Sequence, residues 1–261
     1  MTKEITSTAN PLIKQLRALA TSKKARQESG LFIIEGWRGI QTLLEHESEL
    51  YTLEQIVVST GWNRGPLPAE IDTVKVPDHV FDKISDVRNA QGILGVISRK
   101  PHTPELPAQG HFLLLDNLRD PGNLGTLIRS AVGAGFDGIL LYGDCVESTN
   151  PKVIRSTMGT FAFAHLQPVS DSELAQWMEN GFELCVTTGL GGSNLYDTDF
   201  SNKTILVIGS EAHGVSDRLF TKATQKITIP LQPECESLNA AIAGSICMFQ
   251  ITAKRKPAAS Q

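Results

Sequence analysis

The sequence predicts an α/β protein of two domains: a small N-terminal α/β domain and a larger domain built on a mostly parallel sheet. From residue 106 onward, strand-like and helix-like segments alternate, which is the pattern of a parallel sheet covered by helices on both faces. A segment with three prolines and few apolar residues, 98–110, separates the two parts and is typical of a semi-rigid linker. The predicted domains are therefore 1–105, which includes the linker, and 106–261.

The first predicted helix begins near residue 11. Asn10 suits the N-cap and Pro11 suits the first helical position, where a missing N–H costs nothing. Leu12, Leu16 and Leu19 then recur at a spacing that places them on one face. After Gly30 the apolar pattern predicts a strand at 31–34, a helix at 37–47, and strands at 55–59 and 92–97.

The second part contains five predicted strand–helix pairs. The predicted strands are 112–116, 138–142, 183–187, 204–208 and 226–229, and the predicted helices are 124–134, 152–161, 173–180, 217–223 and 238–254. Ser170 and Glu173 form the spacing of a capping box, and Gly181 is suited to end the helix that follows. Because ligands of parallel sheets bind at the carboxyl ends of the strands, the segments after these strands are where a site is expected.

Composition predicts a globular protein rather than a disordered or membrane-spanning one. Hydrophobic residues make up 41% of the chain and charged residues 20%, and no apolar run approaches the ~18 residues of a membrane span. The first residues lack the apolar core of a secretion signal, so we expect a cytoplasmic protein. No cysteines or histidines stand at metal-ligand spacing, and a metal site is not expected.

The N-terminal segment is basic although the whole chain has a net charge of −4. Residues 1–30 contain six cations and two carboxylates, which leaves a charge of −8 for the rest of the chain. Such a run is usually a solvated face, but it also suits RNA phosphates. The expected RNA contacts are Lys14, Arg17, Lys23, Lys24 and Arg26.

Three polar segments interrupt the apolar pattern directly after predicted strands: 116–129, 208–216 and 229–239. In the first, Arg129 stands alone on an otherwise apolar helix and is either a surface residue or a functional one. In the second, Glu211 is either a helix cap or part of a site. In the third, Ser237 is a plausible N-cap, and Asn239 is a poor helix former that indicates a specific contact.

Together these segments resemble the three motifs of the SpoU family of SPOUT RNA methyltransferases. The matches are Asn123-x-Gly125-x-x-x-Arg129, Gly209-x-Glu211-x-x-Gly214, and Ile229-Pro230 followed by Ser237-Leu238-Asn239. Residues 150–159 also resemble the family. The stretches 32–36 and 88–92 are similar to the substrate-binding domain of its ribosomal-RNA members. The chain departs from the family pattern at Pro233, where glycine is usual, and at Ala240-Ala241-Ile242.

The resemblance implies a trefoil-knotted catalytic domain that works as a homodimer, with the active site near the subunit interface. It also implies transfer of a methyl group from S-adenosylmethionine to a ribose 2′-hydroxyl of a structured RNA. The resemblance favours large-subunit ribosomal RNA as the substrate, with transfer RNA as the alternative. By position, the implied cofactor contacts are Thr188, Gly189, Gly209, Ile229 and Leu238.

The family gives the central catalytic role to Arg129, with Asn123, Glu211, Ser237 and Asn239 orienting it and the ribose. A guanidinium stays protonated in proteins, so we expect Arg129 to grip a phosphate and stabilise the developing alkoxide rather than act as a base.

Two further classes of protein are alternatives. A catalytically inactive RNA-binding relative would be expected to have lost Arg129 or Asn239, and both are present. Gly189-Leu190-Gly191-Gly192 follows a predicted strand and imitates the start of a dinucleotide fingerprint. Asn194 occupies the third glycine position, however, and no helical pattern begins there, which disfavours a nucleotide-dependent oxidoreductase.

Overall fold

The computed structural model describes residues 3–87, 89–101 and 106–253. The chain forms two compact units, one of Met1–His102 with Glu147–Phe163, and one of Thr103–Val146 with Ala164–Gln261. Three parts of the predictions lie outside the described residues: Arg88, part of the linker, and Lys254 at the end of the last predicted helix.

The segment Glu147–Phe163 joins the N-terminal unit, which differs from the single boundary predicted after residue 105. Ile154 and Phe161 are buried in one apolar cluster with Phe32 and other residues of the N-terminal unit. Burial of these large side chains explains why a segment of the second half of the chain packs with the first. No sequence signal near 147 or 163 indicated this.

The first helix of the N-terminal unit begins as predicted. Asn10 accepts a hydrogen bond from the Leu12 N–H at 2.9 Å, and α1 (Pro11–Thr21) buries Ile13, Leu16 and Leu19. Leu12 is only partly buried, because Ile13 takes the core position beside it. A short helix that was not predicted, α2 (Lys23–Ser29), follows and ends at Gly30 in the left-handed conformation.

The described sheet of this unit is five-stranded, in the order β1-β4-β3-β5-β2. Its elements are β1 (Lys3–Glu4), β2 (Leu31–Glu35), α3 (Trp37–Glu45), β3 (Tyr51–Ser59), β4 (Asp72–Val76), α4 (Asp78–Phe81) and β5 (Ile93–Arg99). Strand β5 runs antiparallel to both its neighbours, whereas β1, β4 and β3 are mutually parallel.

The second unit confirms the predicted mostly parallel sheet. Its seven described strands have the order β10-β12-β9-β11-β6-β7-β8, and each neighbouring pair is parallel. The strands are β6 (Gly110–Asp116), β7 (Gly138–Tyr142), β8 (Leu166–Val169), β9 (Glu183–Thr187), β10 (Ser193–Asn194), β11 (Lys203–Ile208) and β12 (Gln225–Thr228).

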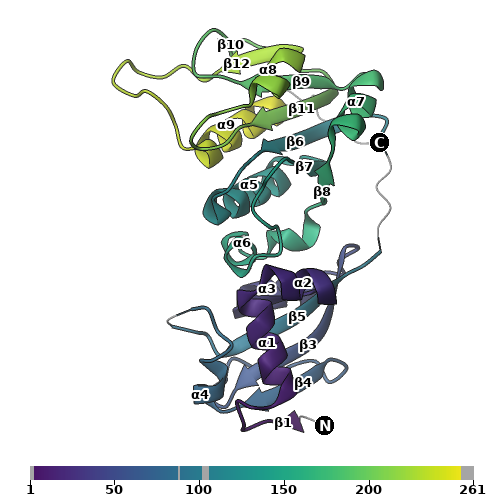
Figure 1. Ribbon diagram of the computed structural model, residues 1–261, viewed down its shortest axis with the longest axis vertical. Helices are drawn as coiled ribbons and strands as arrows, with labels where there is room; N and C mark the ends of the chain where they lie inside the picture. Colours follow the sequence, from purple (N-terminus) through teal and green to yellow (C-terminus); the bar gives the residue numbers. More distant parts are fainter. Residues whose placement is uncertain (1–2, 88, 102–105, 254–261) are drawn as a thin grey trace. The chain divides into compact units, whose positions relative to one another are not determined.

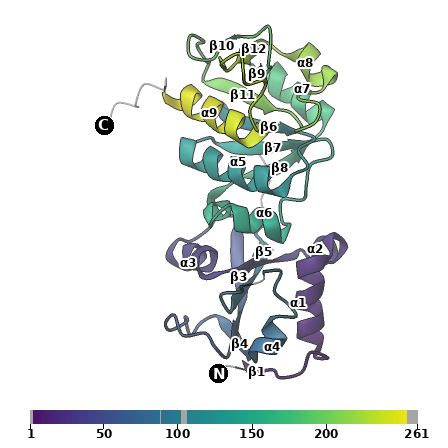
Figure 2. The ribbon, with the colours of Figure 1, turned by 90° about the vertical axis from the view of Figure 1, so that its left-hand side faces the viewer.

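Helices cover both faces of this sheet, as predicted (Figures 1 and 2). One face carries α5 (Pro121–Ala134) and α9 (Ala240–Ala253), and the other carries α7 (Asp171–Glu179) and α8 (Asp217–Lys222). The predicted capping box at Ser170 is present. The helix predicted at 152–161 is instead α6 (Pro151–Ser156) and a 3-10 turn, η1 (Thr160–Phe163), because Met158 and Gly159 between them have positive φ.

The C-terminal helix returns across the sheet. Strand β12 pairs with β9, whereas α9 packs on α5 and β11, so the chain crosses back past β9 between these two elements. The two helices approach closely: a Cβ on Gly244 would lie 2.5 Å from Leu127 Cδ2, and Ser245 donates to Ser130 at 2.7 Å. A bilayer-spanning helix, long and apolar throughout, does not occur in the part of the chain that the structure describes.

Candidate active site

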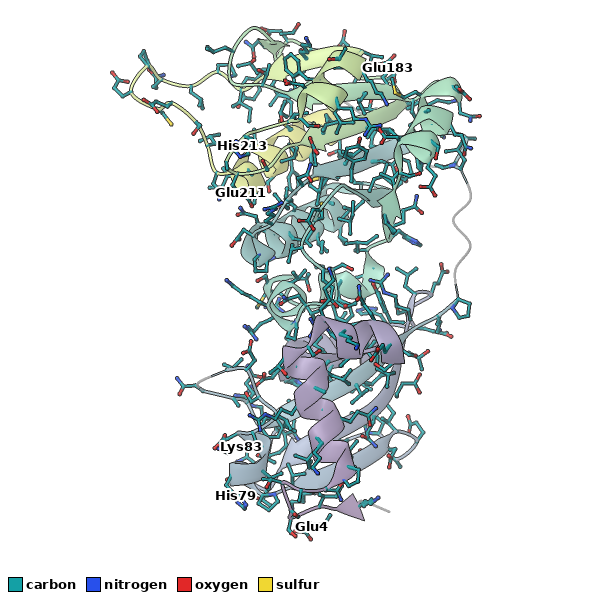
Figure 3. All side chains as sticks on the ribbon, in the orientation of Figure 1. Glu4, His79, Lys83, Glu183, Glu211 and His213 are labelled. Carbon is teal, nitrogen blue, oxygen red and sulfur yellow. The ribbon has the colours of Figure 1, made fainter. Side chains whose placement is uncertain are left out.

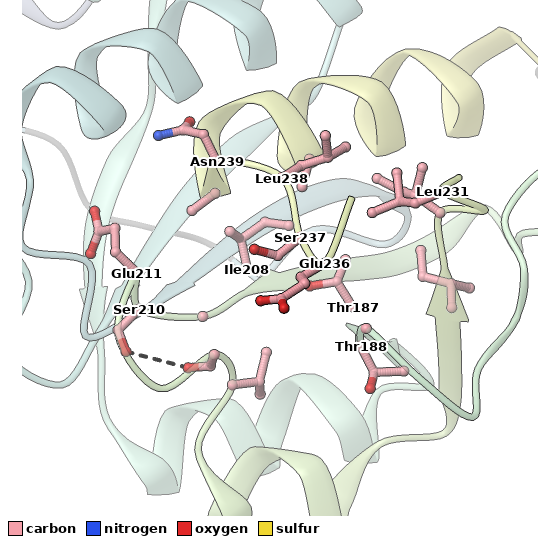
Figure 4. A pocket seen from close by; sticks show the side chains of 18 residues that line it. Thr187, Thr188, Ile208, Ser210, Glu211, Leu231, Glu236, Ser237, Leu238 and Asn239 are labelled. Carbon is pink, nitrogen blue, oxygen red and sulfur yellow. Dashed lines mark hydrogen bonds between the residues drawn. The ribbon is translucent and has the colours of Figure 1, made fainter. Parts of the chain in front are cut away.

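A cavity of about 460 Å³ opens at the carboxyl ends of β9, β11 and β12 (Figure 4). This is where open parallel sheets bind their ligands. The residues that line it include all five positions expected to contact the cofactor, Thr188, Gly189, Gly209, Ile229 and Leu238. The loop after each of the three strands therefore contributes to one site.

The loop after β11 folds back on itself so tightly that Gly209 has no room for a side chain. A Cβ there would lie 1.9 Å from the Gly214 carbonyl carbon and 2.1 Å from the Val215 nitrogen. Ser210 and Gly214 exchange two backbone hydrogen bonds of 2.9 Å across the turn. The backbone, rather than a cofactor contact alone, requires both glycines of the second motif.

Asp116 anchors the other end of this loop and was missed by the sequence analysis. Its carboxylate is fully buried at the end of β6 and accepts a hydrogen bond from the Ser216 N–H at 2.7 Å. An aspartate that closes an apolar strand was the available signal, since a buried carboxylate requires such partners.

One side chain from each motif joins a chain of hydrogen bonds beside the cavity. Asn123 Nδ2 donates to Glu211 Oε1 at 2.8 Å, and Asn239 Nδ2 donates to Asn123 Oδ1 at 3.0 Å. The Asp120 N–H also donates to Glu211, at 3.3 Å. Figure 3 labels Glu211 on its loop, with His213 next to it. Residues 88 and 116 positions apart in the sequence are thus fixed relative to one another.

The hydrogen bonds hold Glu211 as a carboxylate. Partial burial would raise its pKa, but the hydrogen bonds from Asn123 and from backbone N–H groups outweigh burial and lower the pKa below the usual value. The amide of Asn123 is thereby oriented, with its oxygen turned to Asn239.

Asn239, not Ser237, caps the last helix. Its Oδ1 accepts from the N–H groups of Ala241 at 2.9 Å and Ile242 at 3.2 Å, and α9 begins at Ala240. The N-cap predicted at Ser237 is therefore wrong by two residues, and Asn239 combines capping with its bond to Asn123. Ser237 lines the cavity instead.

Arg129 lies apart from the cavity. It is exposed on α5, and its side chain makes no hydrogen bond or ion pair within the described ranges. Thr126 and Gly133, which share its side of the helix, are also exposed. The four other residues expected to act in catalysis, Asn123, Glu211, Ser237 and Asn239, gather at or beside the cavity, whereas Arg129 does not join them within the chain.

The cavity has the chemistry that a sulfonium compound requires. Glu211 and Glu236 are its charged residues, and the described residues around it include no lysine, arginine or histidine. Two carboxylates favour a ligand with positive charge. Ile227, Ile229 and Leu231 supply an apolar wall, and no atom lies within 4 Å of the place a Cβ would take on Gly189. The lining therefore fits S-adenosylmethionine.

Comparison with known families decides the assignment of the catalytic unit. The model of the SpoU rRNA Methylase family matches residues 110–249, which is more than half of the chain. The chain belongs to this family. A second model, the MRM3-like substrate binding domain, matches residues 10–95 in the N-terminal unit.

Relatives of this SpoU member extend over nearly its whole length. An uncharacterized tRNA/rRNA methyltransferase of Synechocystis sp. is 31% identical, over 94% of this chain and 92% of the relative. The 23S rRNA (guanosine(2553)-2′-O)-methyltransferase RlmP of Bacillus subtilis is 28% identical, over 95% of this chain and 99% of the relative.

A solved structure gives the same result for the fold. The AdoMet-bound rRNA methyltransferase of Sinorhizobium meliloti superposes with a TM-score of 0.83 at 27% identity, over 98% of this chain and 99% of that one. The predicted family and the predicted α/β fold of a SPOUT enzyme are confirmed.

Arg26 is the one expected RNA contact that the structure contradicts. Its side chain is 5% exposed, its Nε and Nη2 donate to the Glu147 carboxylate at 2.8 and 2.6 Å, and its Nη1 donates to the Leu19 carbonyl at 2.7 Å. Burial would raise the pKa of Glu147, but the hydrogen bonds from Arg26 and Thr149 lower it. Both edges of the guanidinium are occupied, so Arg26 holds Glu147–Phe163 in the N-terminal unit and is not available to a phosphate.

Proposed function

We propose that this SpoU enzyme transfers a methyl group from S-adenosylmethionine to a ribose 2′-hydroxyl of structured RNA, and that its substrate is large-subunit ribosomal RNA. The observation that carries the proposal is the Glu211–Asn123–Asn239 chain of hydrogen bonds beside a cavity that suits a sulfonium ligand. The B. subtilis relative is named for this reaction on 23S rRNA, and the S. meliloti structure contains AdoMet. The MRM3-like N-terminal domain favours ribosomal over transfer RNA.

The protein's task in this reaction is placement. The cofactor supplies a methyl group that its sulfonium already makes electrophilic. The chain must hold the 2′-oxygen in line with that methyl and stabilise negative charge as the hydroxyl loses its proton to solvent water. Asn123 and Asn239, fixed by Glu211, orient the ribose, and Ser237 contributes a hydroxyl from the cavity wall. Arg129 grips the neighbouring phosphate with its planar fork.

Cofactor binding tests the proposal without RNA. We expect isothermal calorimetry to detect S-adenosylmethionine and S-adenosylhomocysteine binding to the full chain in the presence of EDTA, since the cavity lining holds the chemistry for both. If neither compound binds while NADH does, the oxidoreductase alternative returns and the methyltransferase assignment fails.

A homodimer through α9 would explain the position of Arg129. Ile242 and Phe249 are each 52% exposed, and Ile246 lies between them at helical spacing, which makes an apolar stripe on the surface. A Cβ on Gly133 of α5 would lie 3.7 Å from the Phe249 ring, so the stripe borders the side of α5 that carries Arg129. A second copy packed on the stripe would bring the two subunits' arginines to the interface.

We therefore expect the wild-type chain to be a dimer by light scattering at micromolar concentration, and Phe249→Asp to be a monomer. Burying an aspartate without a partner in an apolar interface costs about 3–5 kcal/mol, because its charge is left uncompensated. Tyr196→Asp is the control, since Tyr196 is 49% exposed but lies next to β10. A monomeric wild type contradicts the dimer, and dissociation by Tyr196→Asp but not by Phe249→Asp contradicts an interface through α9.

The remaining basic residues of the N-terminus keep the role proposed from the sequence. Lys14, Arg17, Lys23 and Lys24 are exposed on α1 and α2. Lys24 pairs with Glu28 at 3.7 Å, but both side chains are more than two-thirds exposed, so the pair yields easily to a phosphate. We propose that these four cations add sequence-independent RNA affinity.

A cytoplasmic location also stays a prediction.

A further inference from the structure

The N-terminal unit has a second, smaller cavity of about 150 Å³ that the proposed reaction does not use. It is lined by the end of β2, the start of α3, the residues Val87, Asn89 and Gln91, and α6 with the turn that follows it. All of these belong to one compact unit, because Glu147–Phe163 packs with the first hundred residues. The cavity therefore exists only through the docking of that segment.

Arg155 of α6 brings an incompletely paired guanidinium to this cavity. Its Nη2 lies 3.6 Å from Asp86 Oδ2, beyond hydrogen-bond distance. Its Nη1 is buried without a hydrogen-bond partner among the described residues. Leaving a buried donor of a charged group unsatisfied is costly, and a phosphate oxygen is the acceptor that a guanidinium fork fits best.

Other features of the lining make the cavity electropositive. Arg38, exposed on α3, lines the cavity as a second cation. Helix α3 begins there behind Gly36, which offers no side-chain cap, and Gln91 Oε1 accepts from only the first N–H of the helix, that of Trp37, so the positive end of the helix dipole adds to the cavity's charge. The carboxylate of Glu35 is the opposing charge: it interacts with Arg155 and accepts hydrogen bonds from the Ser85 hydroxyl and the Asp86 N–H, which leaves two guanidinium groups against one carboxylate in the lining.

The rest of the lining includes apolar side chains and amide groups. Met158 is 43% exposed and has a φ of 55°. The following Gly159 fixes this turn, because a Cβ there would lie 2.6 Å from Thr42 Oγ1. Val87 also lines the cavity. Asn89 and Gln91 add amides, and Gln91 is oriented by the hydrogen bond that its Oε1 accepts from the Trp37 N–H at 3.0 Å.

We infer that this cavity binds one nucleotide of the RNA substrate, turned out from its neighbours, and so helps to select the substrate. The phosphate contacts Arg155 and Arg38, the base lies against Met158 and Val87, and the amides of Asn89 and Gln91 hydrogen-bond the edge of the base. Unstacked bases held on side chains, with their edges read by hydrogen bonds, are how single-stranded RNA is recognised. The inference rests on the proposed function, since it assumes an RNA substrate.

The decisive comparison is between Arg155→Gln and Asp86→Asn, measured as affinity for purified bacterial 23S ribosomal RNA over a range of salt concentrations. Both variants remove the same ion pair, but only the first removes the phosphate contact. We expect Arg155→Gln to weaken binding roughly tenfold and to lower the salt slope by about one phosphate contact. Asp86→Asn should bind as well as wild type or better, because it frees the guanidinium. Equal weakening by both variants, or by neither, overturns the inference.

A methionine signal reports the site directly. Met158 is one of four methionines, so its methyl resonance is easily assigned in carbon-13 methionine-labelled protein. We expect it to shift on addition of the four nucleoside 5′-monophosphates, whereas the methyl of Met178 on α7 stays unchanged. Absence of any shift at Met158 overturns the inference. If S-adenosylmethionine and RNA still bind, only the inference fails; if neither binds, the proposed function fails with it.

Discussion

Replacing Arg129 by lysine or by alanine is expected to lower the methylation rate by roughly a hundredfold or more, the range for loss of one oriented electrostatic group. The melting temperature and the affinity for S-adenosylmethionine should barely change, because Arg129 is exposed, does not line the cofactor cavity and makes no ion pair in the described part of the chain. Lysine keeps the charge but not the planar fork, so it should fail almost as alanine does.

Arg119→Lys is the control for this series. Arg119 precedes the same helix and pairs at 3.1 Å with Asp144, but both side chains are more than 70% exposed. Exposed ion pairs contribute little to stability, so the methylation rate of Arg119→Lys should stay near that of the wild type. The measurement is transfer of tritiated methyl groups to ribosomal RNA. A near-normal rate for Arg129→Lys would reduce Arg129 to a surface residue.

Gly209→Ala should abolish most cofactor binding. The added Cβ would lie within about 2.1 Å of the Gly214 and Val215 backbone, so the loop that carries Glu211 must open. Overpacking of this kind costs roughly 1–3 kcal/mol or more, since backbone cannot move aside as a side chain does. Calorimetry should therefore show the affinity for S-adenosylmethionine reduced by tenfold or more.

Gly133→Ala is the matched substitution on α5. Its Cβ would meet only the Phe249 ring, at an ordinary distance of 3.7 Å, and alanine favours a helix over glycine by roughly 0.5–1 kcal/mol. Its melting temperature should equal or exceed that of wild type, with unchanged cofactor affinity. Wild-type affinity in Gly209→Ala would mean that the tight turn is not needed for the cofactor cavity.

The sequence predicted the parts of the fold that depend on local pattern. Strands β9 and β11 and helices α5, α7 and α8 lie within three residues of their predicted bounds. The two strands are strongly apolar, and α5 and α7 have side-chain N-caps at Asp120 and Ser170. Strand β8 was missed because it contains Pro168. The proline is tolerated there because β8 pairs on one side only, at the edge of the sheet.

Features that depend on distant partners could not be predicted. The basic run around Arg26 predicts a solvated cation, because nothing nearby in the sequence indicates its partner Glu147, which lies 121 residues away. The same distance conceals the docking of Glu147–Phe163 on the N-terminal unit. The five residues that the resemblance implied as cofactor contacts do line one cavity, and their contact with the cofactor stays a prediction. The resemblance did not give the hydrogen bonds that join Asn123, Glu211 and Asn239, nor the separation of Arg129 from that cavity.

The chemical identity of the product tests the central claim most directly. Wild-type protein, S-adenosylmethionine with a labelled methyl group, and ribosomal or transfer RNA would be incubated, and the RNA digested to nucleosides for mass spectrometry. We predict label in a 2′-O-methylnucleoside from large-subunit ribosomal RNA. Label in a methylated base, or no transfer to either RNA, would contradict the proposed reaction.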